Sequence, residues 1–168
     1  MPQPAMTTTR APISGLHWHL ADLFALFGRV PLSIHQLLFR LAIAGVFLRA
    51  GLTKIGSWES TVALFADEYK VPVLAPHVAA ALSATFEVGC SMLLLLGLGT
   101  RLAVLPLLGM IMTIQLFVYP QAWSEHLVWG SILLFLLTRG AGAVSVDRLI
   151  GLEPAETRDP LSTSRTRD

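Results

Sequence analysis

Three basic residues interrupt an otherwise apolar stretch of the chain, and their spacing is the first feature that could carry chemistry. Arg40, Arg49 and Lys54 all lie within residues 40–56, "RLAIAGVFLRAGLTKIG". A basic side chain at the centre of a membrane-spanning helix costs roughly 2.5–3.5 kcal/mol on insertion scales. Such side chains usually face other helices, so each of the three is expected to have a partner or a function.

Glu87 is the acidic residue best placed to pair with one of these cations. It lies near the middle of a second apolar stretch, residues 74–98. At a rise of about 1.5 Å per residue, Arg40 and Glu87 lie at similar depths if their helices start at opposite membrane faces. We therefore predict a buried ion pair between Arg40 and Glu87, and we favour a structural over a chemical role for it.

A second polar layer is predicted nearer the outer membrane face. Arg49 and Lys54 lie at a depth comparable to that of Glu125 and His126 in the fourth apolar stretch. These four residues predict a shallow pocket that is open to the outer face. Two cations and a titratable histidine could hold an anion or the polar head of a quinone. The alternative is that the four side chains only ring the helix ends in water.

The chain offers few residues of the kinds that bind metals or redox cofactors. Cys90 is the single cysteine, which excludes an intramolecular disulfide and a two-cysteine motif. Met110 and Met112 do not share a helix face, so they make a poor copper site. We predict no metal site. The sequence also lacks a flavin or nucleotide motif, so a redox role would need quinone or the cofactor of a partner.

The overall composition is typical of a membrane protein. Hydrophobic residues make up 54% of the 168 residues, and charged residues make up 14%. Soluble domains average about 25% charged residues. The net charge of +1 gives no reason to expect a nucleic acid partner, and the lipid bilayer is the first partner that we expect.

The polar residues must be positioned by helices. The apolar runs predict an all-α fold that consists of a bundle of four transmembrane helices. The spans are predicted at about 33–56, 74–98, 102–119 and 122–144, each near the ~20 residues that crossing a bilayer requires. They form a membrane domain over residues 33–151. Residues 16–32 predict a short interfacial amphipathic helix, or alternatively a helix packed on the protein itself. Residues 1–15 and 152–168 are predicted to be disordered.

The distribution of Lys and Arg predicts the orientation of the four spans. If four spans are present, eight of these residues lie on the side of the termini, whereas only Lys54 and Lys70 lie on the other side. The eight are Arg10, Arg29, Arg101, Arg139, Arg148, Arg158, Arg165 and Arg167. Cytoplasmic loops carry an excess of Lys and Arg. We therefore expect a multi-pass protein of a bacterial-type inner membrane, with both termini in the cytoplasm.

The ordered pattern of residues resembles the DoxX family of small four-helix membrane proteins. Its members typically show an Arg opening the first helix, a Gly-x-x-Lys near its end, a Glu before an apolar run, a Leu-Gly-x-x-Thr-Arg turn and a terminal Ser-x-Asp. The matching residues are Arg40, Gly51 with Lys54, Glu87, Gly97 with Thr100 and Arg101, and Ser145 with Asp147. The resemblance covers about residues 33–151. It departs from the family at Arg49, where an aromatic residue or His is common.

The resemblance implies a function in a membrane redox or stress-response system. The family is named for its similarity to a membrane subunit of thiosulfate:quinone oxidoreductase, so the chain is expected to anchor or serve such a system, with quinone as the candidate cofactor. It would be at most a membrane subunit of an oxidoreductase, not an enzyme on its own. A redox enzyme, another membrane subunit or a second copy would be its partner. The alternatives are a non-catalytic scaffold in a metal- or oxidative-stress system and, less favoured, a small transporter.

Overall fold

The computed structural model describes residues 24–25, 28 and 30–152. The chain divides into two compact units, Met1–Pro31 and Leu32–Asp168, and all the long helices belong to the second. The segments predicted to be disordered, residues 1–15 and 152–168, lie outside the described residues except for Leu152. Most of the predicted interfacial helix, residues 16–32, lies outside them as well.

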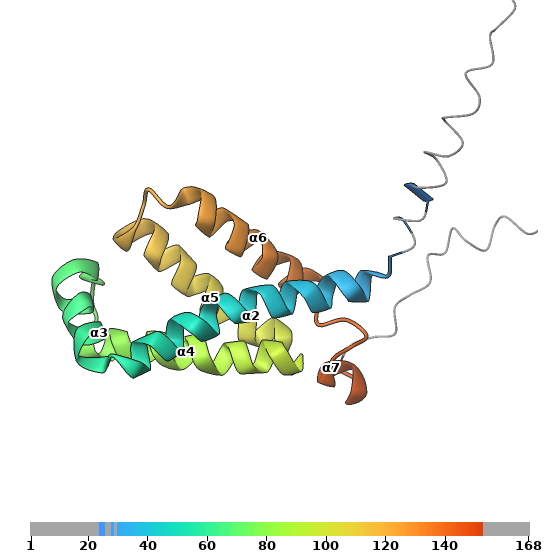
Figure 1. The fold of residues 1–168 in the computed structure, drawn as a ribbon, viewed down its shortest axis with the longest axis horizontal. Helices are drawn as coiled ribbons and strands as arrows, with labels where there is room; N and C mark the ends of the chain where they lie inside the picture. Colours follow the sequence, from blue (N-terminus) through green and yellow to red (C-terminus); the bar gives the residue numbers. More distant parts are fainter. Residues whose placement is uncertain (1–23, 26–27, 29, 153–168) are drawn as a thin grey trace, which may run out of the picture. The chain divides into compact units, whose positions relative to one another are not determined.

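Helices form the second unit, and no strand occurs among the described residues. In chain order the elements are α2 (Leu32–Gly56), α3 (Trp58–Leu64), the π-helix η1 (Phe65–Tyr69), α4 (Pro76–Leu96), α5 (Thr100–Thr113), the π-helix η2 (Ile114–Val118), α6 (Trp123–Arg139) and α7 (Val146–Leu149) (Figure 1). The predicted all-α class is therefore confirmed.

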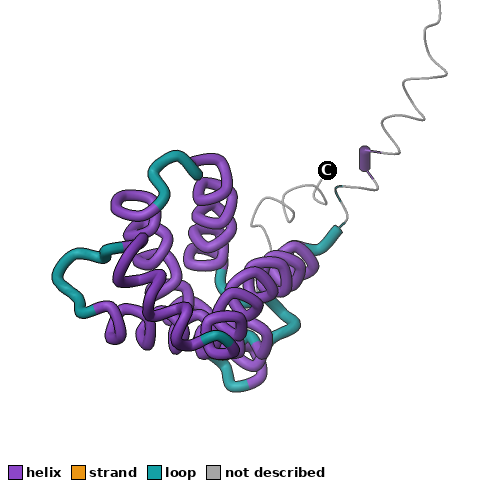
Figure 2. Tube along the Cα trace, turned by 60° about the vertical axis from the view of Figure 1, so that its left-hand side comes forward, coloured by secondary structure: helices purple, strands orange, loops and turns teal. Residues whose placement is uncertain are grey.

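The four long helices pack around a common core. Helix α2 lies along α4, α4 packs against α5, α5 against α6, and α6 returns to α2. Figure 2 shows the helices gathered into one bundle. Each helix turns one apolar stripe inward, as the helical period requires. The buried core consists mainly of aliphatic side chains: Ile43, Ala44, Leu94, Val104, Leu107, Leu133 and Leu136.

Two segments of this bundle are long and apolar enough to cross a membrane. They are Pro76–Leu96, which is α4, and Thr100–Val118, which combines α5 with η2. The four predicted spans coincide in position with α2, α4, α5–η2 and α6. The helices are thus where the apolar runs predicted them, and length and hydropathy identify two of them as candidate spans.

The turn between α4 and α5 is held by Asp147, which is far away in sequence. Its carboxylate accepts hydrogen bonds from the backbone N–H groups of Gly99 (2.7 Å) and Thr100 (3.0 Å). These N–H groups begin α5 and have no partner within the helix, so a carboxylate stabilises them. The N–H of Asp147 donates in turn to the carbonyl of Gly97 (2.9 Å), whose φ of +67° closes α4.

The link between α2 and α4 is itself helical, although the sequence predicted no element for residues 57–73. Helix α3 is tied to α2 because the Thr61 hydroxyl donates to the Lys54 carbonyl (3.1 Å). The π-helix η1 then packs on α4 through Phe65, Ala79 and Ala80. This segment covers one end of the bundle next to the polar residues.

Candidate functional site

A cavity of about 490 Å³ lies between α2, α4, α5–η2 and α6, with η1 as part of its wall. Most of its lining is apolar, including Phe47, Phe86 and Trp129. The polar and charged side chains in its wall are Lys54, Tyr69, Ser83, Glu87, Thr113, Tyr119, Glu125 and His126. Ligand sites for small molecules commonly combine this size with an apolar wall and a few polar groups.

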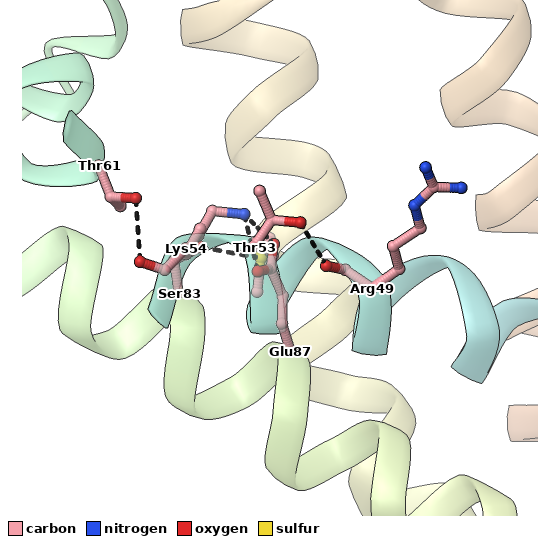
Figure 3. Close-up of polar contacts among 7 residues, drawn as sticks. Arg49, Thr53, Lys54, Thr61, Ser83 and Glu87 are labelled. Carbon is pink, nitrogen blue, oxygen red and sulfur yellow. Dashed lines mark hydrogen bonds and ion pairs between the residues drawn. The ribbon is translucent and has the colours of Figure 1, made fainter. Parts of the chain in front are cut away.

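Lys54 and Glu87 form an ion pair in this wall. The Nζ atom of Lys54 lies 2.6 Å from Oε1 and 2.7 Å from Oε2 of Glu87. Their side chains are 18% and 4% exposed, so the pair is largely desolvated. Figure 3 shows the two side chains reaching toward each other from α2 and α4. A buried pair of this kind leaves no full charge uncompensated.

The close approach of α2 and α4 explains why Lys54 meets Glu87. Gly51 lies one turn before Lys54, and a Cβ atom added to it would lie 2.9 Å from the Cβ of Glu87 and 2.8 Å from Cγ2 of Val88. Only a glycine lets the two backbones come this close. The contact brings Glu87 to the level of Gly51, within reach of the next turn of α2.

The predicted ion pair between Arg40 and Glu87 is therefore wrong, because the cation that pairs with Glu87 is Lys54. Both carboxylate oxygens of Glu87 accept from Lys54. Arg40 is also buried, but its guanidinium donates to the carbonyls of Leu94 (3.3 Å) and Val144. Glu87 lies beside Gly51, eleven positions after Arg40 in α2, because the contact at Gly51 sets the register of the two helices.

His126 has a defined hydrogen-bonding arrangement on the opposite wall. It is 6% exposed, and its Nδ1 atom lies 2.6 Å from Oε1 of Gln115. The amide Nε2 of Gln115 donates to the carbonyl of Pro120 (2.8 Å). The His126 ring also contacts Trp129, with 5.8 Å between ring centroids. Gln115 lies in η2, and π-helical turns are frequent at functional sites.

Of the four residues of the predicted outer pocket, three lie together in the wall of one cavity. Lys54, Glu125 and His126 line the cavity, but Arg49 is exposed and lies in the wall of shallower depressions beside Leu52 and Thr53. Its guanidinium points away from the Lys54–Glu87 pair in Figure 3. Lys54 lies five positions after Arg49, about 140° around the helix. The two residues line one shallow depression together, but only Lys54 also lines the cavity.

Residues that the sequence analysis did not assign to the site complete its wall. Glu87 is part of the cavity wall, where it forms an ion pair with Lys54. Gln115 orients the ring of His126 by a hydrogen bond. At one edge, the Tyr119 hydroxyl donates to the Glu68 carboxylate, and the Tyr119 ring contacts that of Tyr69 edge-on. Gln115 could have been found as the one strongly polar side chain inside the third apolar run. Nothing in the sequence pattern singles out Tyr119.

The donor set of the cavity fits an uncharged organic ring better than an ion. Within the described part of the chain, no three His, Cys, Asp or Glu side chains gather in a way that could hold a metal ion. The cation in the wall is already neutralised by Glu87. The remaining polar groups can hydrogen-bond a carbonyl or hydroxyl, while the aromatic side chains can pack on a ring.

Comparison with known proteins identifies the family of the chain. The sequence model of the DoxX family matches residues 35–120, just over half of the chain. The matched region includes α2, α4 and α5–η2 almost completely, and it includes both Lys54 and Glu87. No curated protein and no solved structure matches the chain significantly.

Proposed function

We propose that this chain, which belongs to the DoxX family, is a membrane subunit that binds a quinone ring for a redox or stress-response system. The observation that carries the proposal is the apolar cavity with the Lys54–Glu87 pair in its wall. The chain would supply a binding site, and the electrons would pass to or from the cofactor of a partner.

The charge of the wall supports a neutral ligand rather than an anion. Glu87 accepts from Lys54 through both oxygens, so an anion would have to displace a buried carboxylate. An ammonium group has three N–H donors, and one remains after the two bonds to Glu87. That donor suits a quinone carbonyl, because a neutral acceptor does not disturb the ion pair.

The proposal places the four long helices across a bacterial-type inner membrane. Helix α2, with 25 residues, is about 37 Å long, and α6, with 17 residues, is about 25 Å long at 1.5 Å per residue. Both lengths suit a hydrocarbon core of about 30 Å with some tilt or thinning. The excess of Lys and Arg puts both termini in the cytoplasm and the cavity in the outer half of the bundle.

A scaffold function is the second candidate, and Arg49 favours it. This side chain is exposed on α2 and turned away from the ion pair (Figure 3). An exposed arginine at membrane depth is costly, and a carboxylate from another membrane subunit would offset that cost. The two functions are compatible, because Arg49 does not line the cavity.

Blocking the cavity tests the proposal. Gly109 lines it, and a Cβ atom added there meets nothing within 4 Å, so Gly109→Leu should place its side chain in the cavity without breaking the fold. We expect at least about tenfold weaker binding of decyl-benzoquinone, measured by quenching of tryptophan fluorescence in detergent.

Gly130→Leu is the matched control, because Gly130 is a helical glycine that is equally free of neighbours and does not line the cavity. It should bind like the wild type. Equal quinone binding by the two variants, or no binding by the wild type, would reject the quinone site. The scaffold function would then be the remaining candidate.

A further inference from the structure

The amide of Gln115 has a single consistent orientation. One end of it faces the carbonyl oxygen of Pro120 at 2.8 Å. A carbonyl oxygen can only accept, so that end must be the NH₂ group. The other end, 2.6 Å from Nδ1 of His126, must then be the amide oxygen.

This orientation determines which nitrogen of His126 carries the proton. An amide oxygen only accepts, so Nδ1 of His126 must be the donor. In the neutral ring, Nε2 is then the acceptor, because a neutral imidazole has one donor and one acceptor. No hydrogen bond to Nε2 occurs among the described residues. Since His126 is mostly buried and lines the cavity, a ligand is the natural donor.

We infer that Nε2 of His126 accepts a hydrogen bond from a hydroxyl of the bound ring, so that the site recognises the reduced, dihydroxy form of the ligand. The inference rests on the proposed function and specifies which form of the ring binds best. A quinone has only acceptor oxygens and leaves Nε2 unpaired, whereas a quinol can donate. An unpaired buried acceptor weakens binding, and sites built to bind a hydroxyl reject analogues that lack one.

The other ionisable groups in the wall do not replace His126 in this role. Lys54 is a donor, and Glu87 is occupied by Lys54. Glu125 lines the cavity but is exposed, so water can hydrogen-bond to it in the empty site. The hydroxyls of Tyr69 and Tyr119 also line the cavity region, and that of Tyr119 donates to Glu68. His126 is therefore a mostly buried residue that offers the cavity an acceptor whose pairing depends on the ligand.

The test compares three probes that share one tail: decyl-benzoquinol kept reduced without oxygen, its dimethyl ether and decyl-benzoquinone. Wild-type protein should bind the benzoquinol about tenfold more tightly than the ether or the quinone. In His126→Phe this preference should fall to about one. His77→Phe is the matched control: His77 is an exposed histidine on α4 outside the cavity wall, and the preference should remain.

A second measurement needs no variant and covers the case that His126→Phe does not fold. In ¹⁵N-histidine-labelled wild type, the Nε2 resonance of His126 should have the shift of an unprotonated nitrogen, and the benzoquinol but not the ether should move it. A preference that persists in His126→Phe, or an Nε2 resonance that the benzoquinol leaves unchanged, overturns the inference. If the wild type binds all three probes equally, the inference is wrong and the proposed function stands. If it binds none, the proposed function fails.

Discussion

Lys54 of α2 and Glu87 of α4 share a bidentate ion pair, with Nζ 2.6 and 2.7 Å from the two carboxylate oxygens. The pair joins the two helices next to Gly51, which lets them approach closely. It also forms part of the wall of the cavity. One relationship therefore connects the packing of the bundle to its candidate binding site.

Gly51→Ala should destabilise the bundle. The added methyl group would overlap Val88 and Glu87, at 2.8 and 2.9 Å, and overpacking of this kind typically costs about 1–3 kcal/mol. Thermal unfolding in detergent would measure the loss. Gly45→Ala, in the same helix with nothing within 4 Å of the added atom, should not destabilise the bundle, because alanine is the better helix former. Equal melting temperatures for the two variants would disprove the close contact.

Lys54→Met should be more harmful than the double variant Lys54→Met with Glu87→Gln. The single change leaves the Glu87 carboxylate buried without its cation, which costs about 3–5 kcal/mol for a buried pair. The double change removes both charges. Unfolding of the two single variants and the double variant gives the coupling energy.

Arg40 provides the control for this coupling. Arg40→Gln and Glu87→Gln should have additive effects, because Glu87 shares no hydrogen bond or ion pair with Arg40. Coupling of Glu87 to Arg40 instead of Lys54 would show that the assignment of the pair is wrong.

Asp147→Ala should weaken the start of α5. The backbone N–H groups of Gly99 and Thr100 lose their acceptor, and loss of a helix N-cap costs about 0.5–2 kcal/mol. Hydrogen exchange of residues 99–103 should accelerate. Asp67→Ala, at an exposed aspartate of η1, should leave this exchange unchanged. Unaltered exchange in Asp147→Ala would mean that the cap does not stabilise α5.

Tyr119→Phe should loosen the segment that covers one end of the cavity. It removes the hydrogen bond to Glu68 but keeps a ring against Tyr69. We expect several-fold faster hydrogen exchange in α3 and η1, with exchange in α6 unchanged, because local opening follows the contacts that a segment loses. If exchange in α3 and η1 does not change, the contact does not hold the segment.

The positions of the long helices could be predicted because an apolar run of about 20 residues is typical of a membrane-spanning helix. The predicted run 33–56, for example, became α2, Leu32–Gly56. The cap by Asp147 could not be predicted from hydropathy, since it joins backbone and side chain across 48 positions of sequence. Helices α3 and η1 were missed because the segment 57–73 is short and carries no long apolar run.

Helix geometry explains which residues of the predicted site lie together and which do not. Depth estimated from residue number grouped Lys54 with Glu125 and His126, which line one cavity, but it put Glu87 in a different polar layer. The partner of Glu87 depends on how far one helix slides along the next, and the Gly51 contact decides this. Arg49 does not line the cavity because of its angular position around α2. Depth in the membrane says nothing about this angle.

The most direct test of the central claim is to map where a quinone binds. A benzoquinone that carries a photoreactive azide on its ring should, on illumination, label residues of α2, α4, α5–η2 and α6 in the cavity wall, and excess decyl-benzoquinone should prevent the labelling. Mass spectrometry of the labelled peptides identifies the residues. Competed labelling around Lys54, Glu87 and His126 is the predicted result, whereas labelling confined to the side of α2 that carries Arg49, or labelling that excess quinone does not reduce, would contradict the account.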